Sequence, residues 1–493
     1  MANQNLDRFF EKREEEGVKL TFGDVRMHTN YSEISPENTN ISSRFSRRIP
    51  LLIPIVSSAM DTVTEAKMAI AMAELGGLGI IHKNMSPEEQ AKQVRMVKLY
   101  VNGRIESPIC IEANNTVAEV EAWRASKGFK FHSFPVTGQK GELLGLVTRS
   151  DFRFVESPTM SVAQIMTSRD NMVIAPASTT PEDALAIMRK HKKNALPLVD
   201  ENSRVVGMYV FSDLSRIHSG QSSHNVDAKG QLIVAAAVGA GSDALSRAAQ
   251  LAKVGCDVFV IDTAHGDSKN VHDTIKALKK SYPHIDVVAG NVSRGEATKR
   301  LIDVGADGVL VGQGPGSICT TRIVAGIGCP QVSAIYDCAR AARGTDVPVC
   351  GDGGIQNSGD IAIALAVGAQ SVILGSLLAG TKESPGEVVL QGQKQVKLYR
   401  GMGSLGAMLD RAESRSRYGQ GGVSLDKLVP EGVEGTVPYK GDLSNVINQC
   451  VGGLRGSMAY HGQVTLAGLR DNVEIFRMTG AGLAESHPHD ITV

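Results

Sequence analysis

The stretch Val254-Gly255-Cys256-Asp257-Val258-Phe259-Val260-Ile261-Asp262 contains the pattern that decides the fold. A glycine ends a helical segment, and a run of apolar, mostly β-branched residues then closes on a carboxylate. The glycine and the run recur at 304–311 and, more weakly, at 367–374. Each such unit is typical of a helix followed by a buried strand of a parallel sheet.

The chain contains eight apolar runs of strand length, separated by segments with helical periodicity. Two lie near the N-terminus and six lie after residue 230. The runs are 53–57, 79–82, 233–237, 258–262, 287–291, 309–312, 347–352 and 371–375. Eight alternating units of this size predict an α/β protein whose fold is a (β/α)8 TIM barrel.

The alternation stops near residue 103, and an internal repeat follows it. The matched pairs, each 62 residues apart, are Pro135 and Pro197, Gly145 and Gly207, and Asp151 and Asp213. Each copy has the order helix, strand, strand, helix. We therefore predict a barrel in two parts, 1–103 and 221–493, with a tandem domain at 104–220 whose copies span about 104–157 and 161–220. A purely structural insertion is the alternative.

Composition narrows the class of function. The chain has 493 residues, with 52 basic and 52 acidic side chains, so its net charge gives no drive toward nucleic acid or an anionic membrane. The N-terminus is polar and no run of about 18 apolar residues occurs, so we expect a cytoplasmic protein without a membrane span. Seven scattered cysteines without C-x-x-C spacing indicate reduced thiols.

Active sites of such barrels lie where the strands end, and the loop 312–322 follows one of them. It reads Gly-Gln-Gly-Pro-Gly-Ser-Ile-Cys-Thr-Thr-Arg. Cys319 is our candidate nucleophile, because Arg322 or a following helix start could favour its thiolate. A small buried thiol in a tight turn is the alternative. Further candidates follow other strands: Ser57, Asp61, His82, Asp262, Asn291 and Asp352.

Glycines and a serine after the last two strands predict a phosphate site, at Gly353, Gly354, Gly375 and Ser376. Asp352 would repel phosphate, so we expect it to accept hydrogen bonds from sugar hydroxyls, with a capping role as the alternative. No G-x-G-x-x-G fingerprint supports a Rossmann fold.

Two segments after the last strand also carry candidates. The segment 409–427 is charged and poor in apolar residues, which predicts a structureless lid or a solvated loop. The segment 428–435 then carries two acids between glycines, and one carboxylate could reach a substrate or act as a base.

Several motifs, in chain order, resemble those of the IMP dehydrogenase / GMP reductase family. They are 60–64, 81–85, 314–322, 352–355, 399–404, 417–418 and 428–432. The repeat at 104–220 resembles a tandem pair of cystathionine-β-synthase (CBS) modules. The resemblance covers nearly the whole chain. It implies NAD-dependent oxidation of inosine 5′-monophosphate (IMP) to xanthosine 5′-monophosphate, in guanine nucleotide biosynthesis.

In the reaction that the resemblance implies, Cys319 attacks C2 of the hypoxanthine ring, hydride leaves for NAD⁺, and water hydrolyses the resulting thioimidate. Arg417 and Tyr418 on the lid would serve the hydrolysis, with Thr321 and Glu431 as an alternative proton relay. Reductive deamination of guanosine 5′-monophosphate (GMP) by NADPH is the rival activity, and a non-catalytic nucleotide sensor is another. The pair Arg417-Tyr418 favours the dehydrogenase.

The resemblance also implies a set of binding residues. IMP would be held by Ser317, Asp352, Gly354, Gly375, Ser376, Tyr399, Gly401, Gly403 and Glu431, and NAD would face Asp262, Gly312, Gln313 and Gly314. A potassium ion would bind the carbonyls of Gly314, Gly316 and Cys319, with Glu485, Ser486 and His487 of a neighbouring subunit. Glu485 as a simple surface acid is the alternative.

Assembly and regulation follow from the same resemblance. It implies a homotetramer, with an octamer through the CBS modules as a further option, and purine nucleotide effectors at those modules. Asp151 and Asp213 would contact ribose or cap helices. Gly419 stands where many relatives have phenylalanine, which implies weaker closure of the lid.

Overall fold

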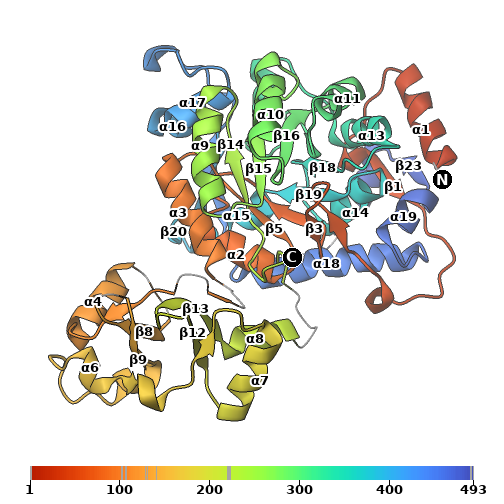
Figure 1. Ribbon diagram of the computed structural model, residues 1–493. Coiled ribbons are helices and arrows are strands. Elements are labelled where there is room, and N and C mark those ends of the chain that lie inside the picture. Colours follow the sequence, from red (N-terminus) through yellow and green to blue (C-terminus); the bar gives the residue numbers. More distant parts are fainter. Residues whose placement is uncertain are drawn as a thin grey trace. The chain divides into compact units, whose positions relative to one another are not determined.

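The computed structural model describes residues 3–100, 104–105, 108–127, 129, 131–139, 141–218, 224–488 and 491. The chain forms two compact units (Figure 1). Unit 1 comprises residues 1–98, 223–225 and 232–493, and unit 2 comprises residues 99–222 and 226–231. The boundaries predicted at residues 103 and 220 fall outside the described residues, so the domain limits stay a prediction.

Unit 1 is built on a closed barrel of eight parallel strands. In barrel order they are β14 (Ala235–Val238), β15 (Val258–Asp262), β16 (Asp286–Val292), β17 (Gly308–Val311), β18 (Val349–Asp352), β19 (Ser371–Leu374), β4 (Ile55–Ser57) and β5 (Leu78–Ile81). All eight predicted strands and the (β/α)8 fold are confirmed. Strand β5 pairs directly with β14, although the residues of unit 2 separate these two strands in the sequence. The insertion therefore does not interrupt the barrel.

Helices alternate with the strands and cover the barrel from outside (Figure 1). They are α2 (Ala66–Glu74), α3 (Pro87–Lys98), α9 (Ser242–Lys253), α10 (Lys269–Ser281), α11 (Gly295–Asp303), α13 (Gln331–Ala342), α14 (Ser358–Ala366) and α15 (Ser376–Ala379). Helix α10 shows why they pack: it buries Val271, Thr274, Ile275 and Leu278, which share one face at a spacing of three or four residues. The barrel interior is filled by side chains that include Val56, Ile80, Val260, Leu310 and Ile373.

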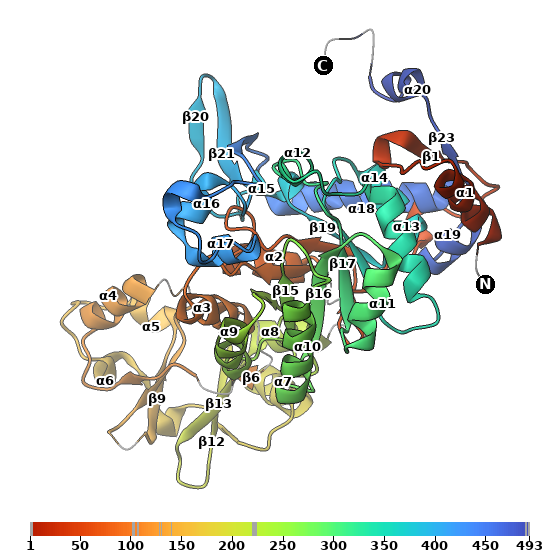
Figure 2. The ribbon, with the colours of Figure 1, turned by 90° about the horizontal axis from the view of Figure 1, so that it is seen from above.

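A three-stranded antiparallel sheet projects beside the barrel mouth, and the sequence reading missed it. Its strands are β20 (Val389–Gln391), β21 (Lys394–Arg400) and β22 (Glu434–Pro438). Tyr399 pairs with Gly435 and Arg400 with Glu434, so the glycine-rich turn after β21 and the segment before β22 lie side by side. Figure 2 shows this sheet next to α16 and α17.

The prediction that 409–427 is structureless was wrong. The segment contains the end of α16 (Leu405–Asp410), then α17 (Ala412–Arg417) and the short helix η4 (Leu425–Lys427). Polar side chains stabilise these helices: the Ser404 hydroxyl accepts from the Ala407 amide at 3.3 Å, and the Ser414 hydroxyl is buried against the Met402 carbonyl. A hydropathy pattern does not reveal helices that turn polar residues inward.

Among the remaining elements of unit 1, one strand pair joins an N-terminal segment to a C-terminal one. Strand β1 (Val25–Met27) pairs antiparallel with β23 (Ile475–Arg477). The others are α1 (Gln4–Glu15), η1 (Phe22–Asp24), η2 (Pro36–Asn38), β2 (Ser43–Arg44), β3 (Pro50–Leu51), α12 (Thr321–Val324), α18 (Leu443–Tyr460), α19 (Leu466–Asn472) and α20 (Gly480–Glu485).

Unit 2 contains two four-stranded sheets, β10-β9-β8-β7 and β11-β12-β13-β6. Its elements are β6 (Arg104–Ile105), β7 (Ile111–Glu112), α4 (Val117–Lys127), β8 (Phe134–Thr137), β9 (Leu143–Val147), α5 (Arg149–Arg153), α6 (Val162–Ile165), β10 (Thr167–Ser168), η3 (Arg169–Asn171), β11 (Ala175–Pro176), α7 (Pro181–His191), β12 (Ala195–Val199), β13 (Val205–Val210) and α8 (Phe211–His218).

The repeat within unit 2 extends to strand register. Phe134 pairs with Val147, and the residues 62 positions later, Leu196 and Tyr209, pair in the same way. The register also shifts at the matching point of both hairpins, after Val136 and after Leu198. The predicted order of helix, strand, strand, helix is present in both copies, as α4, β8, β9, α5 and as α7, β12, β13, α8.

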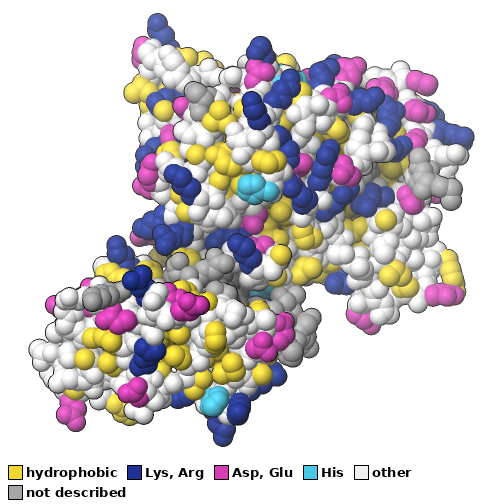
Figure 3. Space-filling model, viewed as in Figure 1, with side chains coloured by type: hydrophobic (Ala, Val, Ile, Leu, Met, Phe, Trp, Pro, Cys, Tyr) yellow, Lys and Arg dark blue, Asp and Glu magenta, His cyan; other side chains and the backbone are white. Residues whose placement is uncertain are grey.

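The charged surface and the state of the cysteines agree with what the composition predicts. Basic and acidic side chains both occur across the face drawn in Figure 3. All seven cysteines are free thiols, as predicted. Among the described residues, no helix is both long enough and apolar enough to cross a membrane.

Candidate active site

The cysteine loop leaves β17 at the barrel mouth, and its first residue must be glycine. Gly312 has φ +152°, and a Cβ there would lie 2.0 Å from the Asp352 carbonyl oxygen. The Cys319 amide then donates to the Gly316 carbonyl at 3.1 Å, which turns the loop. Its other side is held by the segment before β22, because the Val433 amide donates to the Ile318 carbonyl at 2.9 Å.

A chain of three polar groups begins at the thiol. The Cys319 thiol donates to Thr321 Oγ1 at 3.2 Å, and the Thr321 hydroxyl donates to Glu431 Oε2 at 2.7 Å. Backbone bonds fix both ends, since the Thr320 amide donates to the Glu431 carbonyl at 2.9 Å and the Glu431 amide donates to the Gly403 carbonyl at 3.0 Å. A proton leaving the sulfur has a direct path to a carboxylate.

Arg322 is not a neighbour of the thiol, although the sequence offered it as one. Its guanidinium donates to the carbonyl oxygens of Gln313, at 3.4 Å, and Cys329. It therefore ties the start of the cysteine loop, at Gln313, to Cys329 in the segment after α12. The polar group beside the sulfur is the Thr321 hydroxyl, at the start of α12.

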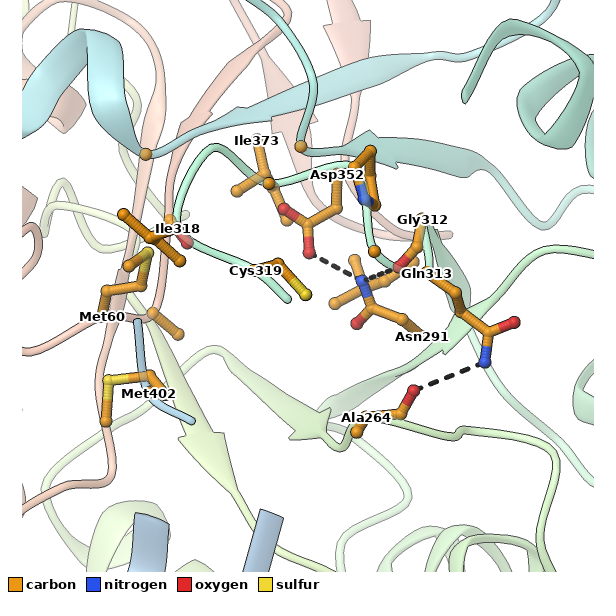
Figure 4. Close-up of a pocket in the computed structure, with 18 of the residues that line it drawn as sticks. Met60, Ala264, Asn291, Gly312, Gln313, Ile318, Cys319, Asp352, Ile373 and Met402 are labelled. Carbon is orange, nitrogen blue, oxygen red and sulfur yellow. Dashed lines mark hydrogen bonds between the residues drawn. The ribbon is translucent and has the colours of Figure 1, made fainter. Parts of the chain in front are cut away.

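The pocket around Cys319 has a polar and an apolar side (Figure 4). Asp352 and Asn291 lie on one side, where Asn291 Nδ2 donates to Asp352 Oδ2 at 2.8 Å and to the Gly312 carbonyl at 2.9 Å. Three apolar side chains that the sequence reading did not single out lie on the other side: Met60, Ile318 and Met402. A flat heterocycle with polar edges fits between two such walls.

Burial raises the pKa of Asp352 to about 6, against a partial opposing effect of the Asn291 bond. The carboxyl is therefore an ionised acceptor at neutral pH and becomes a donor in mild acid. Burial also raises the pKa of Tyr399 to about 12, so this phenol stays protonated and can donate a hydrogen bond to an anion.

Most predicted site residues line this one pocket. They are Asp262, Gly312, Gln313, Gly314, Gly316, Ser317, Cys319, Thr321, Asp352, Gly354, Gly375, Ser376, Tyr399, Arg417 and Tyr418. Glu431, Gly401 and Gly403 lie behind it instead. Glu431 contacts Thr321, Gly401 lies against Ile318, and Gly403 lies beneath the Tyr418 ring, whose Cζ is 2.5 Å from the position of an added Cβ.

The end of α17 covers the mouth of the pocket. The Arg417 guanidinium pairs with the buried Asp262 carboxylate at the end of β15, and the Ala264 amide donates to the Arg417 carbonyl at 3.3 Å. Burial raises the pKa of Tyr418, which packs on Gly403. The lid residues that the sequence singled out thus line the same pocket as Cys319, with Arg417 at the end of α17 and Tyr418 directly after it.

A second group of charges, which the sequence did not predict, lies near the lid: Lys83, Arg247 and Glu413. Burial, with the nearby Arg417 and Arg247, lowers the pKa of Lys83 to about 7. Lys83 belongs to the 81–85 motif after β5, which was a usable signal. Arg247 stands in α9, where a sequence shows only one more charged helix residue.

The structure does not bring the C-terminal candidates to the cysteine loop of the same chain. Glu485, Ser486 and His487 are exposed at the end of α20 and just after it. Helix α20 contacts η1 and lies near β23 (Figure 2). Among the described residues, no cluster of three His, Cys, Asp or Glu side chains could hold a metal ion. A potassium site assembled from backbone carbonyls and a neighbouring subunit stays a prediction.

Comparison with known proteins identifies the family. The model of the IMP dehydrogenase / GMP reductase domain matches residues 19–489. The chain belongs to the IMP dehydrogenase / GMP reductase family. It is 48% identical over 474 residues to the inosine-5′-monophosphate dehydrogenase of Halalkalibacterium halodurans, covering 96% of each chain, and 46% identical to that of Aquifex aeolicus, covering 98% and 97%.

Solved structures of the family include GMP reductase from Trypanosoma brucei. A cysteine-to-alanine variant of it in complex with GMP matches with a TM-score of 0.90 and 39% identity, over 97% of this chain and all of that one. The same reductase in complex with guanosine 5′-triphosphate matches with a TM-score of 0.79 and 34% identity, over 95% of this chain. The family thus contains two activities on similar frames.

Proposed function

We propose that this protein catalyses the NAD-dependent oxidation of IMP to xanthosine 5′-monophosphate, in guanine nucleotide biosynthesis. The observation that carries the proposal is the chain of Cys319, Thr321 and Glu431 under a lid that presents Arg417 and Tyr418. Oxidation followed by hydrolysis needs both a nucleophile and a means of activating water, and this site has groups for each. The relatives named IMP dehydrogenase, at 46–48% identity, support the same reaction.

IMP lies with its purine between the methionine side of the pocket and the Asn291 side. Asp352, ionised at neutral pH, accepts hydrogen bonds from the ribose hydroxyls. The phosphate lies against Ser317, Gly354, Gly375, Ser376 and Tyr399, where backbone amides, hydroxyls and the phenol donate to it. Gly401, Gly403 and Glu431 shape the pocket from behind.

In the first half of the reaction, the Cys319 sulfur forms a bond to C2 of the hypoxanthine ring. The thiol proton passes to Thr321 along the 3.2 Å contact, and the Thr321 hydroxyl gives its own proton to Glu431 along the 2.7 Å contact. One proton thus moves from the sulfur to the carboxylate. NAD⁺, when bound, accepts the hydride that leaves C2. The ring is then attached to the enzyme as a thioimidate.

The residues present fit NAD. Asp262 is a buried carboxylate at the pocket rim, able to accept from ribose or carboxamide groups, and Gly312, Gln313 and Gly314 offer backbone beside it. Arg417 pairs with Asp262 in this structure, so NAD and the lid use the same surface in turn. With the lid in place, Arg417 and Tyr418 cover the thioimidate, and water is activated there to attack C2 and release the sulfur.

We assign a monovalent cation, potassium, to the carbonyls of Gly314, Gly316 and Cys319, with Glu485, Ser486 and His487 of a neighbouring subunit of a homotetramer. The Gly316 carbonyl already accepts the Cys319 amide, and its second lone pair is available to a large cation. Seven free thiols support a cytoplasmic location for this assembly.

Unit 2 is proposed to be a tandem CBS domain that binds purine nucleotides as effectors and can join tetramers into octamers. Its two copies with matched register support this assignment. Asp151 accepts from the Thr148 amide at 2.7 Å and so caps α5, which leaves it less available to a ribose than the sequence alone allowed.

GMP reductase activity is the second candidate, because solved reductases share this frame. The lid favours the dehydrogenase: reductive deamination transfers hydride to the purine and needs no hydrolytic step. The test is to mix the purified protein with IMP and NAD⁺, and separately with GMP and NADPH. Consumption of NADPH alone would overturn the proposal.

Mass spectrometry of protein quenched during turnover with IMP and NAD⁺ tests the mechanism. We expect a nucleotide adduct on the peptide that contains Cys319, and none in the Cys319→Ala variant. A Cys319→Ala variant with full turnover would contradict the role of this sulfur.

A further inference from the structure

Helix α17 is tied to the barrel at both of its ends. At the C-terminal end, Arg417 pairs with Asp262. In the first turn, Glu413 Oε1 accepts from Arg247 Nη2 at 3.2 Å. Glu413 and Arg417 are four residues apart, so they lie on the same face of this short helix, and that face is turned to the barrel. The first-turn contact has no role in the mechanism described above.

Arg247 is a fixed anchor and not a surface side chain. Only 5% of it is exposed, although it stands in an outer helix. Its Nη1 donates to Gln90 Oε1 at 2.9 Å and its Nη2 donates to the Met85 carbonyl at 3.0 Å. Gln90 in turn donates to the carbonyls of Ile81, at 3.1 Å, and Ala237, at 2.8 Å, in the barrel strands β5 and β14.

The anchor therefore connects two adjacent barrel strands to the lid. Its hydrogen-bond partners Gln90 and Met85 are neutral, and Glu413 is the carboxylate hydrogen-bonded to it. The carboxylates of Glu88 and Asp243 add a Coulombic attraction. Taking Glu413 away leaves a buried guanidinium with less compensation, so the closed position of α17 loses a charge-assisted bond. The open position, in which the lid leaves Asp262, loses nothing by the same change.

We propose that Glu413 is a positioning residue, whose bond to Arg247 seats the first turn of α17 and thereby places Arg417 on Asp262 and Tyr418 on Gly403. The inference rests on the proposed function, in which NAD and the lid occupy the Asp262 surface in turn. The Glu413–Arg247 bond then sets how often the lid is closed after hydride has left, and so how fast the thioimidate is hydrolysed.

The variants that test this are Glu413→Gln, which keeps the shape and removes the charge, and Glu413→Asp, which keeps the charge. Asp426→Asn is the matched control, because Asp426 is an exposed carboxylate of the same segment, in η4. With IMP and NAD⁺, we expect Glu413→Gln to lower kcat about tenfold and to leave the rate of the first NADH burst unchanged. KM for NAD should fall, because the lid competes less.

A second measurement is independent of turnover. Hydrogen exchange of the backbone amides of residues 405–418 in the full-length protein should be about tenfold faster in Glu413→Gln, nearer to wild type in Glu413→Asp and unchanged in Asp426→Asn. Unchanged exchange in Glu413→Gln overturns the positioning role whatever the protein catalyses. Faster exchange in a protein that does not oxidise IMP supports the seating of α17 and contradicts only the proposed function. An equal loss of burst rate and kcat would also overturn the inference.

Discussion

Thr321 donates its hydroxyl to Glu431 Oε2 at 2.7 Å, across 110 residues of sequence. The same hydroxyl accepts from the Cys319 thiol at 3.2 Å, so it is the one link through which the sulfur reaches a carboxylate in this chain of groups. Thr321 is the first residue of α12, but its hydroxyl can also pass a proton between the Cys319 sulfur and the Glu431 carboxylate in either direction.

We therefore expect Thr321→Val, which keeps the shape and removes the hydroxyl, to lower kcat about a hundredfold. Thr320→Val is the matched control, one residue away, and should retain activity within about twofold. Steady-state rates with IMP and NAD⁺ measure both variants. Equal rates for the two valine variants would show that protons leave the sulfur by another path.

The contact between Gly403 and Tyr418 gives the second prediction. A Cβ at residue 403 would lie 2.5 Å from Tyr418 Cζ, so Gly403→Ala must push the ring off the pocket. We expect kcat to fall about tenfold while the thermal midpoint changes little, because Tyr418 lies at the rim and not in the core.

Gly435→Ala is the control for that substitution. Gly435 lies in β22 with nothing within 4 Å of an added Cβ, so alanine fits there. Calorimetry should give both variants similar midpoints, and only Gly403→Ala should lose turnover. Full turnover in Gly403→Ala would mean that the Tyr418 ring position is not needed for the reaction.

The barrel was predictable because buried parallel strands are apolar on both faces. Runs such as 258–262 and 287–291 therefore stand out without any knowledge of their neighbours. The cysteine loop was predictable for a related reason, since Gly312 has φ +152° and faces the Asp352 carbonyl where no side chain fits. Local chemistry and tertiary position agree at these points.

The lid was not predictable in the same way. Its helices depend on Ser404 and Ser414, whose hydroxyls bond backbone groups, and such residues usually indicate loops. The position of the Arg322 side chain was not predictable either. Its guanidinium donates to the carbonyls of Gln313 and Cys329, nine and seven residues away, and therefore does not contact the thiol. Arg247 was hidden because burial of a charged residue in an outer helix arises only from contacts distant in sequence.

The pKa of Asp352 predicts how IMP binding depends on pH. Burial raises this pKa to about 6, so the carboxyl gains a proton as the pH falls below that value. The ribose hydroxyls that we propose to bind there then lose their ionised acceptor. We expect kcat/KM for IMP to fall about tenfold per pH unit below pH 6. Asp352→Asn should have weaker IMP binding and lack this limb of the profile.

The same shift has a defined effect on stability. The folded state holds the Asp352 proton more tightly than the unfolded state does, so its contribution to stability is full below about pH 4 and is lost as the pH rises through 6. As the pH rises from 4 to 6, the thermal midpoint of wild type should therefore fall relative to that of Asp352→Asn. A constant difference across this range would contradict the raised pKa.

Lys83 gives the last prediction, with the opposite sign. Burial and the neighbouring Arg417 and Arg247 lower its pKa from 10.5 to about 7, so the unfolded chain binds this proton more tightly. The energetic cost of Lys83 is therefore largest below pH 7 and shrinks as the pH rises toward 10.5. Lys83→Met, of similar length and without charge, should raise the thermal midpoint at pH 6 clearly more than at pH 9. Lys92→Met is the control, because Lys92 is exposed on α3, and its effect should not vary with pH in this range. The same midpoint change at both pH values would contradict the lowered pKa of Lys83. Glu413 would then stabilise the Lys83 ammonium as its counter-ion, in addition to its bond with Arg247.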